Sequence, residues 1–202
     1  HDSPEVFNVI AAEAVLRRLG GFSPQNLSNT AWAFAVADCI AADELFGTLS
    51  FTTRCAQLQS AFTLPELSQL HQWSLWRDER GVPWPALPEP LQQACREAFS
   101  AEEGRPSRLQ ADVVRHIRSH GVDVHEEHRC VISGYSIDAL VTLDNGKKVA
   151  VEVDGPSHFV GDSHQPTGAT LLKRRQLRYF GWCLESVPYW EWDLSHELHW
   201  LA

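Results

Sequence analysis

Two acidic side chains interrupt an alternating hydrophobic run near the middle of the second half of the chain. Residues 149–158 read V-A-V-E-V-D-G-P-S-H, in which valines alternate with Glu152 and Asp154. Because successive side chains of a β-strand point to opposite faces, the valines share one face and the two acids share the other. Carboxylates that converge on one face are suited to binding a hard cation such as Mg²⁺ and to activating water.

A third carboxylate comes from the preceding alternating segment. Residues 136–143 read S-I-D-A-L-V-T-L and carry Asp138 on the polar side, and the sequence D-N-G before the next strand indicates a hairpin. A two-residue turn would place Glu152 on the apolar side. A three-residue loop with Gly146 in the left-handed conformation instead pairs Asp138 with Glu152. We therefore predict this loop and a carboxylate face made by Asp138, Glu152 and Asp154.

Cationic side chains gather in the amphipathic segment 167–180, which we predict to be a helix ended by a glycine. On a helical wheel, Lys173 falls between Leu177 and Phe180, which face the sheet, so we expect Lys173 to pair with the carboxylates. The alternative for Lys173 is a relocated catalytic lysine, and it is also a candidate for phosphate contact. The wheel places three arginines on an outward arc, where guanidinium groups suit phosphate contacts: Arg174, Arg175 and Arg178. The alternative for these arginines is a solvated helix face.

Three more side chains are candidates for phosphate contact. His158 follows the Gly-Pro turn, from which it reaches a phosphate or the acidic cluster; its alternative role is to stabilise the turn. Lys147 and Lys148 directly follow the hairpin loop and extend the basic surface if the strand brings them round. The other histidines and cysteines lack zinc spacing, so we predict no metal or cofactor. Mg²⁺ is expected only if the carboxylates are catalytic.

The composition is that of a globular protein that can bury a core. The chain has 202 residues, of which 44% are hydrophobic and 21% charged, and its five cysteines lack C-x-x-C spacing, which indicates a reducing compartment. No apolar run approaches the length of a membrane span. Because the chain starts at a histidine and contains no methionine, we expect it to be the C-terminal part of a longer protein.

The net charge of −9 would by itself argue against nucleic acid as a partner, but the charge is uneven. Residues 1–104 hold 13 acidic and 6 basic residues, whereas residues 105–202 hold 13 acidic and 11 basic residues. Binding follows the local potential rather than the total. We place a domain boundary at this change in composition, with one domain at 1–104 and a second at 105–202.

The first half is predicted to be helical, and part of it repeats. Helices are expected at 5–19, from residue 22, and at 42–60, 65–79 and 88–101. The sequence F-S-P-Q-N-L-S-N at 22–29 recurs as F-T-L-P-E-L-S-Q at 62–69. A helix pair repeated at this spacing is typical of an α-solenoid. The alternative is two unrelated amphipathic helices.

The second half is predicted to be an α/β unit. Its expected elements are a helix at 107–120, strands at 122–130, 136–143 and 149–154, a helix at 167–180, a strand at 182–187 and a helix at 188–201. The crossover from the third strand to the fourth has the right length for a parallel pair.

Four motifs of this half, taken in order, resemble the RAP domain. They are V-E-V-D-G-P-S-H-F at 151–159, P-T-G-A-T-L-L-K-R-R-Q-L-R at 166–178, G-W at 181–182 and V-P-Y-W-E-W at 187–192. The RAP domain is a C-terminal module of organellar RNA-processing and RNA-stability proteins. The stretch F-S-P-Q-N-L-S-N-T-A-W-A-F-A at 22–35 resembles octotricopeptide-type helical repeats, which often precede RAP domains.

The resemblance implies a fold of α-solenoid-like helical repeats followed by a restriction-endonuclease-like α/β RAP domain. It implies binding to organellar rRNA or mRNA, in RNA maturation or stability or in association with a ribosome, whose proteins are then further partners. We predict a mitochondrial RNA-binding protein, with the chloroplast or another plastid as the alternative location.

Two other functions stay open. In nucleases of the implied fold, a lysine usually follows the second acid by two positions, but here that position is Asp154. The first alternative is therefore a divalent-metal-dependent endoribonuclease that uses Asp138, Glu152 and Asp154 although it lacks this lysine. The second is a structural protein–protein module whose surface is the acidic helical half.

Overall fold

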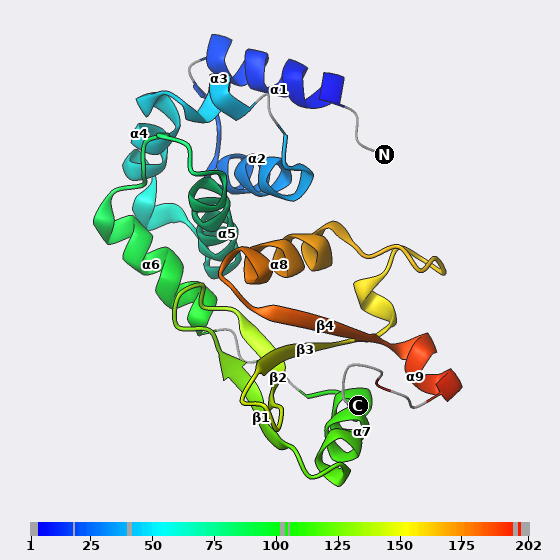
Figure 1. The fold of residues 1–202 in the computed structure, drawn as a ribbon. Helices are drawn as coiled ribbons and strands as arrows, with labels where there is room; N and C mark the ends of the chain where they lie inside the picture. The colour runs from blue at the N-terminus through cyan, green and yellow to red at the C-terminus, as the bar shows by residue number, and fades with distance from the viewer. Residues whose placement is uncertain are drawn as a thin grey trace. The chain divides into compact units, whose positions relative to one another are not determined.

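The computed structural model describes residues 4–17, 19–39, 42–101, 104, 106–195 and 198. Its coordinates divide into two compact units, His1–Glu102 and Glu103–Ala202. That the units are separate domains with a boundary at residue 104 stays a prediction. Figure 1 shows that the first unit is built from helices, whereas the second contains the sheet. None of the described helices is long and apolar enough to cross a membrane.

The first unit packs its helices around a core of aromatic rings. The rings of Phe46 and Trp73 lie 5.3 Å apart between centroids, and Phe34 and Phe51 meet Phe46 edge-on. The helical elements of this unit are α1 (Pro4–Leu16), α2 (Pro24–Ala37), α3 (Ala42–Phe46), α4 (Leu49–Gln57), a 3₁₀ turn (Gln59–Ala61), α5 (Leu64–Arg80) and α6 (Glu89–Ser100).

The single helix predicted at 42–60 is wrong, because the chain breaks between α3 and α4. Thr48 has an extended backbone (φ −112°, ψ 162°), and its hydroxyl accepts a hydrogen bond from the backbone N–H of Ser50. A threonine hydroxyl in this position caps a new helix rather than continuing the old one. Gly47, which disfavours helix interiors, precedes it and weakens the junction further.

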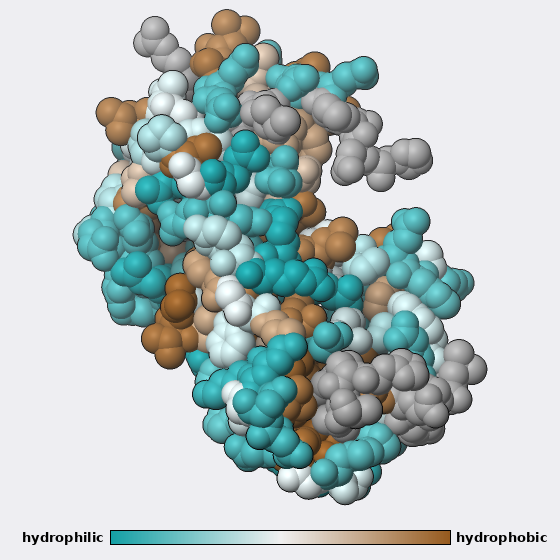
Figure 2. Space-filling view, in the orientation of Figure 1, coloured by the Kyte–Doolittle hydropathy of each residue, from teal (hydrophilic) through white to brown (hydrophobic). Residues whose placement is uncertain are grey.

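Helix α1 carries apolar side chains on its solvent side as well as toward the core. Figure 2 shows hydrophobic surface over this helix. The side chains responsible are exposed: Val6, Val9, Ile10, Val15 and Leu16. The helix is therefore apolar around most of its circumference, which is unusual for the surface of a soluble domain.

The second unit is a four-stranded mixed sheet with helices on both faces. Figure 1 shows α8 on one face and α7 on the other. Its elements are α7 (Arg108–Ser119), β1 (Asp123–Arg129), β2 (Ser136–Thr142), β3 (Lys148–Asp154), a 3₁₀ turn (Pro156–His158), α8 (Gly168–Tyr179), β4 (Cys183–Pro188) and α9 (Tyr189–Ser195). The strand order is β1-β2-β3-β4. The pair β3–β4 is parallel, as predicted. Of the helix predicted at 188–201, the part after Ser195 lies almost entirely outside the described residues.

The valine face of β3 forms the core of this unit. Val149, Val151 and Val153 are buried in one cluster with side chains of α7 such as Val113 and Ile117. These valines therefore hold α7 against the sheet through apolar burial. The alternation of β3 then directs its even-numbered side chains to the opposite face, under α8.

The predicted three-residue hairpin loop between β2 and β3 is confirmed. Ala139 pairs with Val151 and Val141 with Val149. The backbone N–H of Gly146 donates to Leu143 O at 2.8 Å, and Gly146 has a φ of 79°. Only glycine adopts this backbone conformation without strain. The loop thus sets the register that places Asp138 and Glu152 on the same face.

Candidate nucleic-acid interface

The predicted carboxylate face exists, and α8 buries it. Glu152 is 3% exposed and Asp154 is 2% exposed. Asp138, on the neighbouring strand, accepts a hydrogen bond at Oδ2 from the backbone N–H of Val153, with a donor–acceptor distance of 2.7 Å. Charged groups so deeply buried need partners. Those partners come mostly from α8 and β4.

Lys173 of α8 points inward, as the helical wheel predicts. Its Nζ lies 2.5 Å from Oε2 of Glu152. The second carboxylate oxygen of Glu152, Oε1, is buried and has no hydrogen-bond partner. Lys173 therefore acts as a structural counter-ion beneath the surface. The side chain of Lys173 is still 25% exposed, and the idea that it also contacts RNA stays a prediction.

Arg174 also points inward, so the prediction of an outward Arg174 is wrong. One Nη nitrogen donates to Asp154 Oδ2 and to Ser186 Oγ, each at 2.6 Å, and the side chain is 14% exposed. Thr170, Lys173, Arg174 and Leu177 have the i, i+3, i+4, i+7 spacing of one helical stripe. Arg174 lies only about 60° around the wheel from Leu177, and its long side chain reaches the buried acid.

His158 is held by the same carboxylate from the other side. Its Nδ1 lies 3.2 Å from Asp154 Oδ1, and its side chain is 42% exposed. Its backbone carbonyl accepts hydrogen bonds from the Thr167 N–H at 2.8 Å and from the Thr170 hydroxyl at 3.2 Å. The Asp154 contact holds one ring nitrogen, and the other two contacts hold the backbone at His158. His158 thus reaches the acidic cluster, as one of its two predicted roles requires.

This network contains more carboxylates than cations, and two of its acidic groups hold protons more tightly than usual. Burial raises the pKa of Glu152 to about 8, against the opposing effect of Lys173. Burial likewise raises the pKa of the Asp138 carboxyl. Buried Glu152 and Asp154 and half-buried Asp138 face two cations, Lys173 and Arg174, so one bound proton brings the group close to neutrality. Lys173, surrounded by these acids, has a raised pKa because their attraction outweighs its burial.

The network is arranged for internal pairing rather than for metal binding. Among the residues that the structure describes, no group of three or more His, Cys, Asp or Glu side chains is arranged to hold a metal ion. Glu152, Asp154 and Asp138 each contact a donor of the protein itself. The endoribonuclease alternative therefore gains no support from the geometry.

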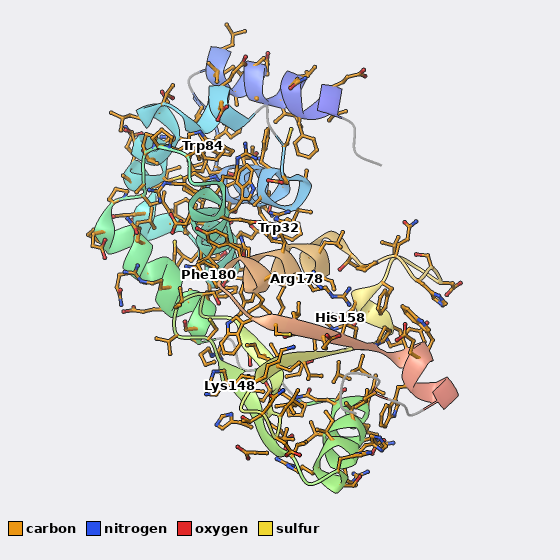
Figure 3. The ribbon with its side chains drawn as sticks, in the orientation of Figure 1. Trp32, Trp84, Lys148, His158, Arg178 and Phe180 are labelled. Atoms are coloured by element: carbon orange, nitrogen blue, oxygen red, sulfur yellow. The ribbon has the colours of Figure 1, made fainter. Side chains whose placement is uncertain are left out.

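The exposed cations lie at two ends of the α8 side. Helix α8 runs back from the end of β3 to the start of β4, and Val149 pairs with Cys183 at that start. The end of α8, with exposed Arg178, therefore lies at the same end of the sheet as exposed Lys148. Figure 3 shows His158 at the opposite end of β3 from Lys148. Lys147 is exposed beside Lys148, whereas Arg175 is half-buried and has a partner.

One histidine pair was not foreseen from the sequence. Strict alternation would place His125 and His128 on opposite faces of β1, but Glu127 between them adopts a left-handed φ of 48°. The two imidazoles consequently lie 5.4 Å apart, and His128 also packs against Trp182. Burial and the nearby His125 and Lys148 lower the pKa of His128.

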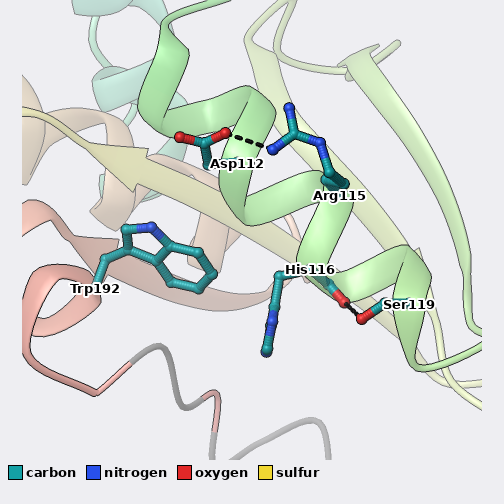
Figure 4. A pocket seen from close by; sticks show the side chains of 5 residues that line it. All are labelled: Asp112, Arg115, His116, Ser119 and Trp192. Carbon is teal, nitrogen blue, oxygen red and sulfur yellow. Dashed lines mark hydrogen bonds and ion pairs between the residues drawn. The ribbon is translucent and has the colours of Figure 1, made fainter.

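A pocket of about 370 Å³ lies on the other face of the sheet, between α7 and α9. Figure 4 shows its lining residues, Asp112, Arg115, His116, Ser119 and Trp192. Asp112 and Arg115 form an ion pair at 2.6 Å, and the Ser119 hydroxyl donates to the backbone carbonyl of His116. Its polar groups are thus paired locally, and the pocket is separate from the carboxylate network.

The family model of the RAP domain matches residues 151–199. This segment contains the end of β3, all of α8 and β4, and with them most of the charge network. A "RAP domain-containing protein, chloroplastic" from Oryza sativa subsp. japonica is 38% identical over 87 residues. These residues are 43% of this chain and only 13% of the rice protein. The resemblance to the RAP domain that the sequence motifs indicate is confirmed.

Proposed function

We propose that this RAP domain-containing chain binds RNA, through the exposed cations on the α8 side of its sheet. The observation that carries the proposal is that some cationic side chains of α8 are turned inward and others outward, inside the segment matched by the RAP model. Lys173 and Arg174 turn inward to pair with acids, whereas Arg178 stays exposed at the surface. A guanidinium at the surface is suited to bidentate contact with a phosphate.

The buried network supports this proposal by removing negative charge from beneath the surface. Three unpaired carboxylates under α8 would repel a phosphate backbone. Their pairing with Lys173 and Arg174, together with a proton on Glu152, leaves the surface cations to set the local potential. The proposed contact surface consists of exposed Lys148 and Arg178 and half-buried His158 and Arg175, with exposed Lys147 at its edge beside Lys148.

We infer that the protein acts in an organelle, on organellar rRNA or mRNA. The name of the rice relative contains the word chloroplastic, which favours the chloroplast, the alternative in the sequence analysis, over the mitochondrion. Roles in RNA maturation or stability, and association with a ribosome and its proteins, are parts of the same proposal. They follow from the RAP resemblance rather than from the geometry of this chain.

We also infer that the first unit contains two copies of a helical repeat. Ser23 and Thr63 each close a capping box at the start of α2 and α5, 40 positions apart in the sequence. The indole N–H of Trp32 donates to the amide oxygen of Gln72, again 40 positions apart, at 2.8 Å. Equivalent positions of successive repeats lie side by side in solenoids. A restriction-endonuclease-like fold for the second unit stays a proposal of the same kind, supported by its mixed sheet with a helix on each face.

The test is a salt titration of RNA binding by the full chain. A fluorescent, unstructured oligouridine RNA is titrated with the wild-type protein at several salt concentrations, and the slope of log K against log[salt] is compared with that of Lys148→Gln/Arg178→Gln. Loss of two phosphate contacts lowers the slope by about 1.4, at about 0.7 for each contact with a single strand. Arg115→Gln is the matched control, because Arg115 is an exposed arginine of α7, which lies on the other face of the sheet.

Two results would overturn the proposal. Wild-type protein that shows no salt-dependent affinity for the RNA would remove RNA binding and favour the protein–protein alternative. A control variant that loses as much affinity and slope as the double variant would show that the α8 side has no special part in binding. Circular dichroism of each variant establishes that the fold is retained.

A further inference from the structure

A short aromatic column stands next to His158, where the parallel strands β3 and β4 end. The imidazole of His164 stacks on the indole of Trp190, with ring centroids 3.9 Å apart and an interplanar angle of 7°. Phe159 packs edge-on against the same indole, at 4.4 Å. His164 is exposed, whereas Trp190 is half-buried. Ligand sites of open α/β sheets commonly lie beyond the carboxyl ends of the strands.

The loop that carries His164 is closed at its base. Phe159 forms an isolated β-bridge with Pro166, and the backbone N–H of Val160 donates to Gln165 O at 2.9 Å. The Thr167 N–H donates to His158 O just beyond this bridge. His158 and His164 are therefore held in a defined relation before any ligand arrives. A pre-formed site binds with a smaller loss of conformational entropy.

We propose that His164 and Trp190 form a base-stacking subsite for single-stranded RNA. The near-parallel ring geometry is that of stacked bases, and a base added on His164 extends the column by one ring. Aromatic side chains stack on unpaired bases without regard to base identity. His158, whose Nδ1 contacts Asp154 and whose side chain is 42% exposed, lies at the base of this loop and is the candidate for the phosphate contact. The inference rests on the proposed RNA binding, and it names a contact that the cationic surface alone does not provide.

The experiment is a coupling measurement between the protein and the RNA. Oligouridine and an oligomer of the same length in which every nucleotide is abasic are each titrated with the wild-type chain and with His164→Ala. We expect the abasic oligomer to bind the wild type about 5- to 10-fold more weakly than oligouridine, which corresponds to about 1 kcal/mol, the low end for a stacked base. The same abasic RNA should bind His164→Ala no more weakly than intact RNA does, because the stacking partner is already absent.

Two further variants separate stacking from an effect on the loop. His164→Phe keeps a flat ring and should retain most of the affinity and the abasic effect. His120→Ala removes an exposed histidine just after the end of α7, away from this loop, and should bind both RNAs as the wild type does. A purely structural role for His164 would lower the affinity for all RNAs equally and would leave the abasic effect unchanged.

The outcomes distinguish this inference from the function on which it rests. Wild-type protein that binds oligouridine, with an abasic effect that is absent or is the same in His164→Ala, overturns the stacking subsite and leaves RNA binding intact. Wild-type protein that binds no RNA overturns both. An abasic effect that disappears in His164→Ala and persists in His164→Phe establishes the subsite.

Discussion

The ammonium group of Lys173 lies 2.5 Å from the carboxylate of Glu152, in a place where water has little access to either. Such a pair contributes little net stability when intact, because both charges lose their hydration. Its disruption is costly, however, since the remaining charge stays buried without a partner. The pair therefore makes a test of whether Lys173 is structural or available to a ligand.

We expect Lys173→Met to lower the free energy of unfolding by about 3 kcal/mol above pH 8, where Glu152 is ionised. In this variant Glu152 stays buried between the sheet and α8 without a counter-ion. One of its carboxylate oxygens, Oε1, has no hydrogen-bond partner even in the wild type. The double variant Lys173→Met/Glu152→Met should recover most of the loss, because it replaces the pair with apolar side chains. Urea unfolding measures both. Arg178→Met, on the exposed side of the same helix, is the control and should change stability by less than about 0.5 kcal/mol. A single Lys173→Met variant as stable as the control would show that the pair is not structural.

The raised pKa of Glu152 predicts a specific pH dependence of stability. Between the ordinary value of 4.5 and the folded-state value of about 8, the folded protein holds a proton that the unfolded chain has released. Stability from this group is therefore present at low pH and falls as the pH rises through that window, by at most about 1.4 kcal/mol per pH unit. The pKa of Lys173 is raised from 10.5, so its contribution changes only above this window.

The measurement compares wild type with Glu152→Gln, which has no proton to lose. Urea unfolding across the window should show the stability of the wild type declining relative to that of the variant. Asp138 contributes to the raised pKa of Glu152, so the comparison measures the titration of the two interacting acids together. Stability curves that run parallel over the whole window would contradict a raised pKa for Glu152.

The carboxylate face was predictable because strand geometry admits few solutions. A period of two residues leaves one register that keeps Val149 and Val153 on the apolar side, and a glycine three residues into the loop selects it. The direction of Arg174 was not predictable from a wheel. A wheel places Cβ atoms, whereas a long guanidinium side chain is drawn to a buried acid on a different strand.

The left-handed residue in β1 was also beyond sequence reasoning, since glutamate rarely adopts that conformation. Glu127 is held by tertiary hydrogen bonds: its carboxylate accepts from the Gln110 amide at 2.7 Å and from the Ser136 hydroxyl at 2.9 Å. Neither partner is close in the sequence, so no local pattern marks the position. The His125–His128 pair that results was missed for the same reason.

The two faces of α8 predict opposite effects for two arginine substitutions. Arg174→Gln should lower the free energy of unfolding by about 2–4 kcal/mol, because it leaves buried Asp154 without its guanidinium partner. Arg178→Gln should leave stability within about 0.5 kcal/mol and instead lower the salt slope of RNA binding by about 0.7. Urea unfolding and oligouridine titration of both variants give the crossed comparison. If both variants were as stable as the wild type and lost RNA affinity equally, Arg174 would be an RNA contact rather than a structural partner of Asp154.

We expect no metal-dependent RNA cleavage by the purified chain. In nucleases of the fold that the RAP resemblance implies, a lysine usually stands at the position of Asp154, and a carboxylate cannot stabilise the charge of a pentacovalent phosphate. Glu152, moreover, is paired with Lys173. Incubation of labelled RNA with protein and Mg²⁺ or Mn²⁺ is the measurement, with Asp138→Asn and Glu152→Gln as controls. Cleavage that disappears in both variants would restore the endoribonuclease alternative.

The register of the β2–β3 hairpin depends on Gly146. Its importance can be tested by comparing substitutions at Gly146 and at Gly155, the residue after β3. Gly146 has a φ of 79°, and an added Cβ would meet no atom within 4 Å, so the cost of Gly146→Ala is backbone strain alone. We expect a loss of about 1 kcal/mol in the free energy of unfolding. Gly155, just after β3, also has open space around an added Cβ but has an ordinary φ of −72°. Gly155→Ala should therefore be neutral, or stabilising by up to about 1 kcal/mol, because it restricts the unfolded chain. If both substitutions cost the same in urea unfolding, the left-handed loop would not be what holds Glu152 on the face of Asp138.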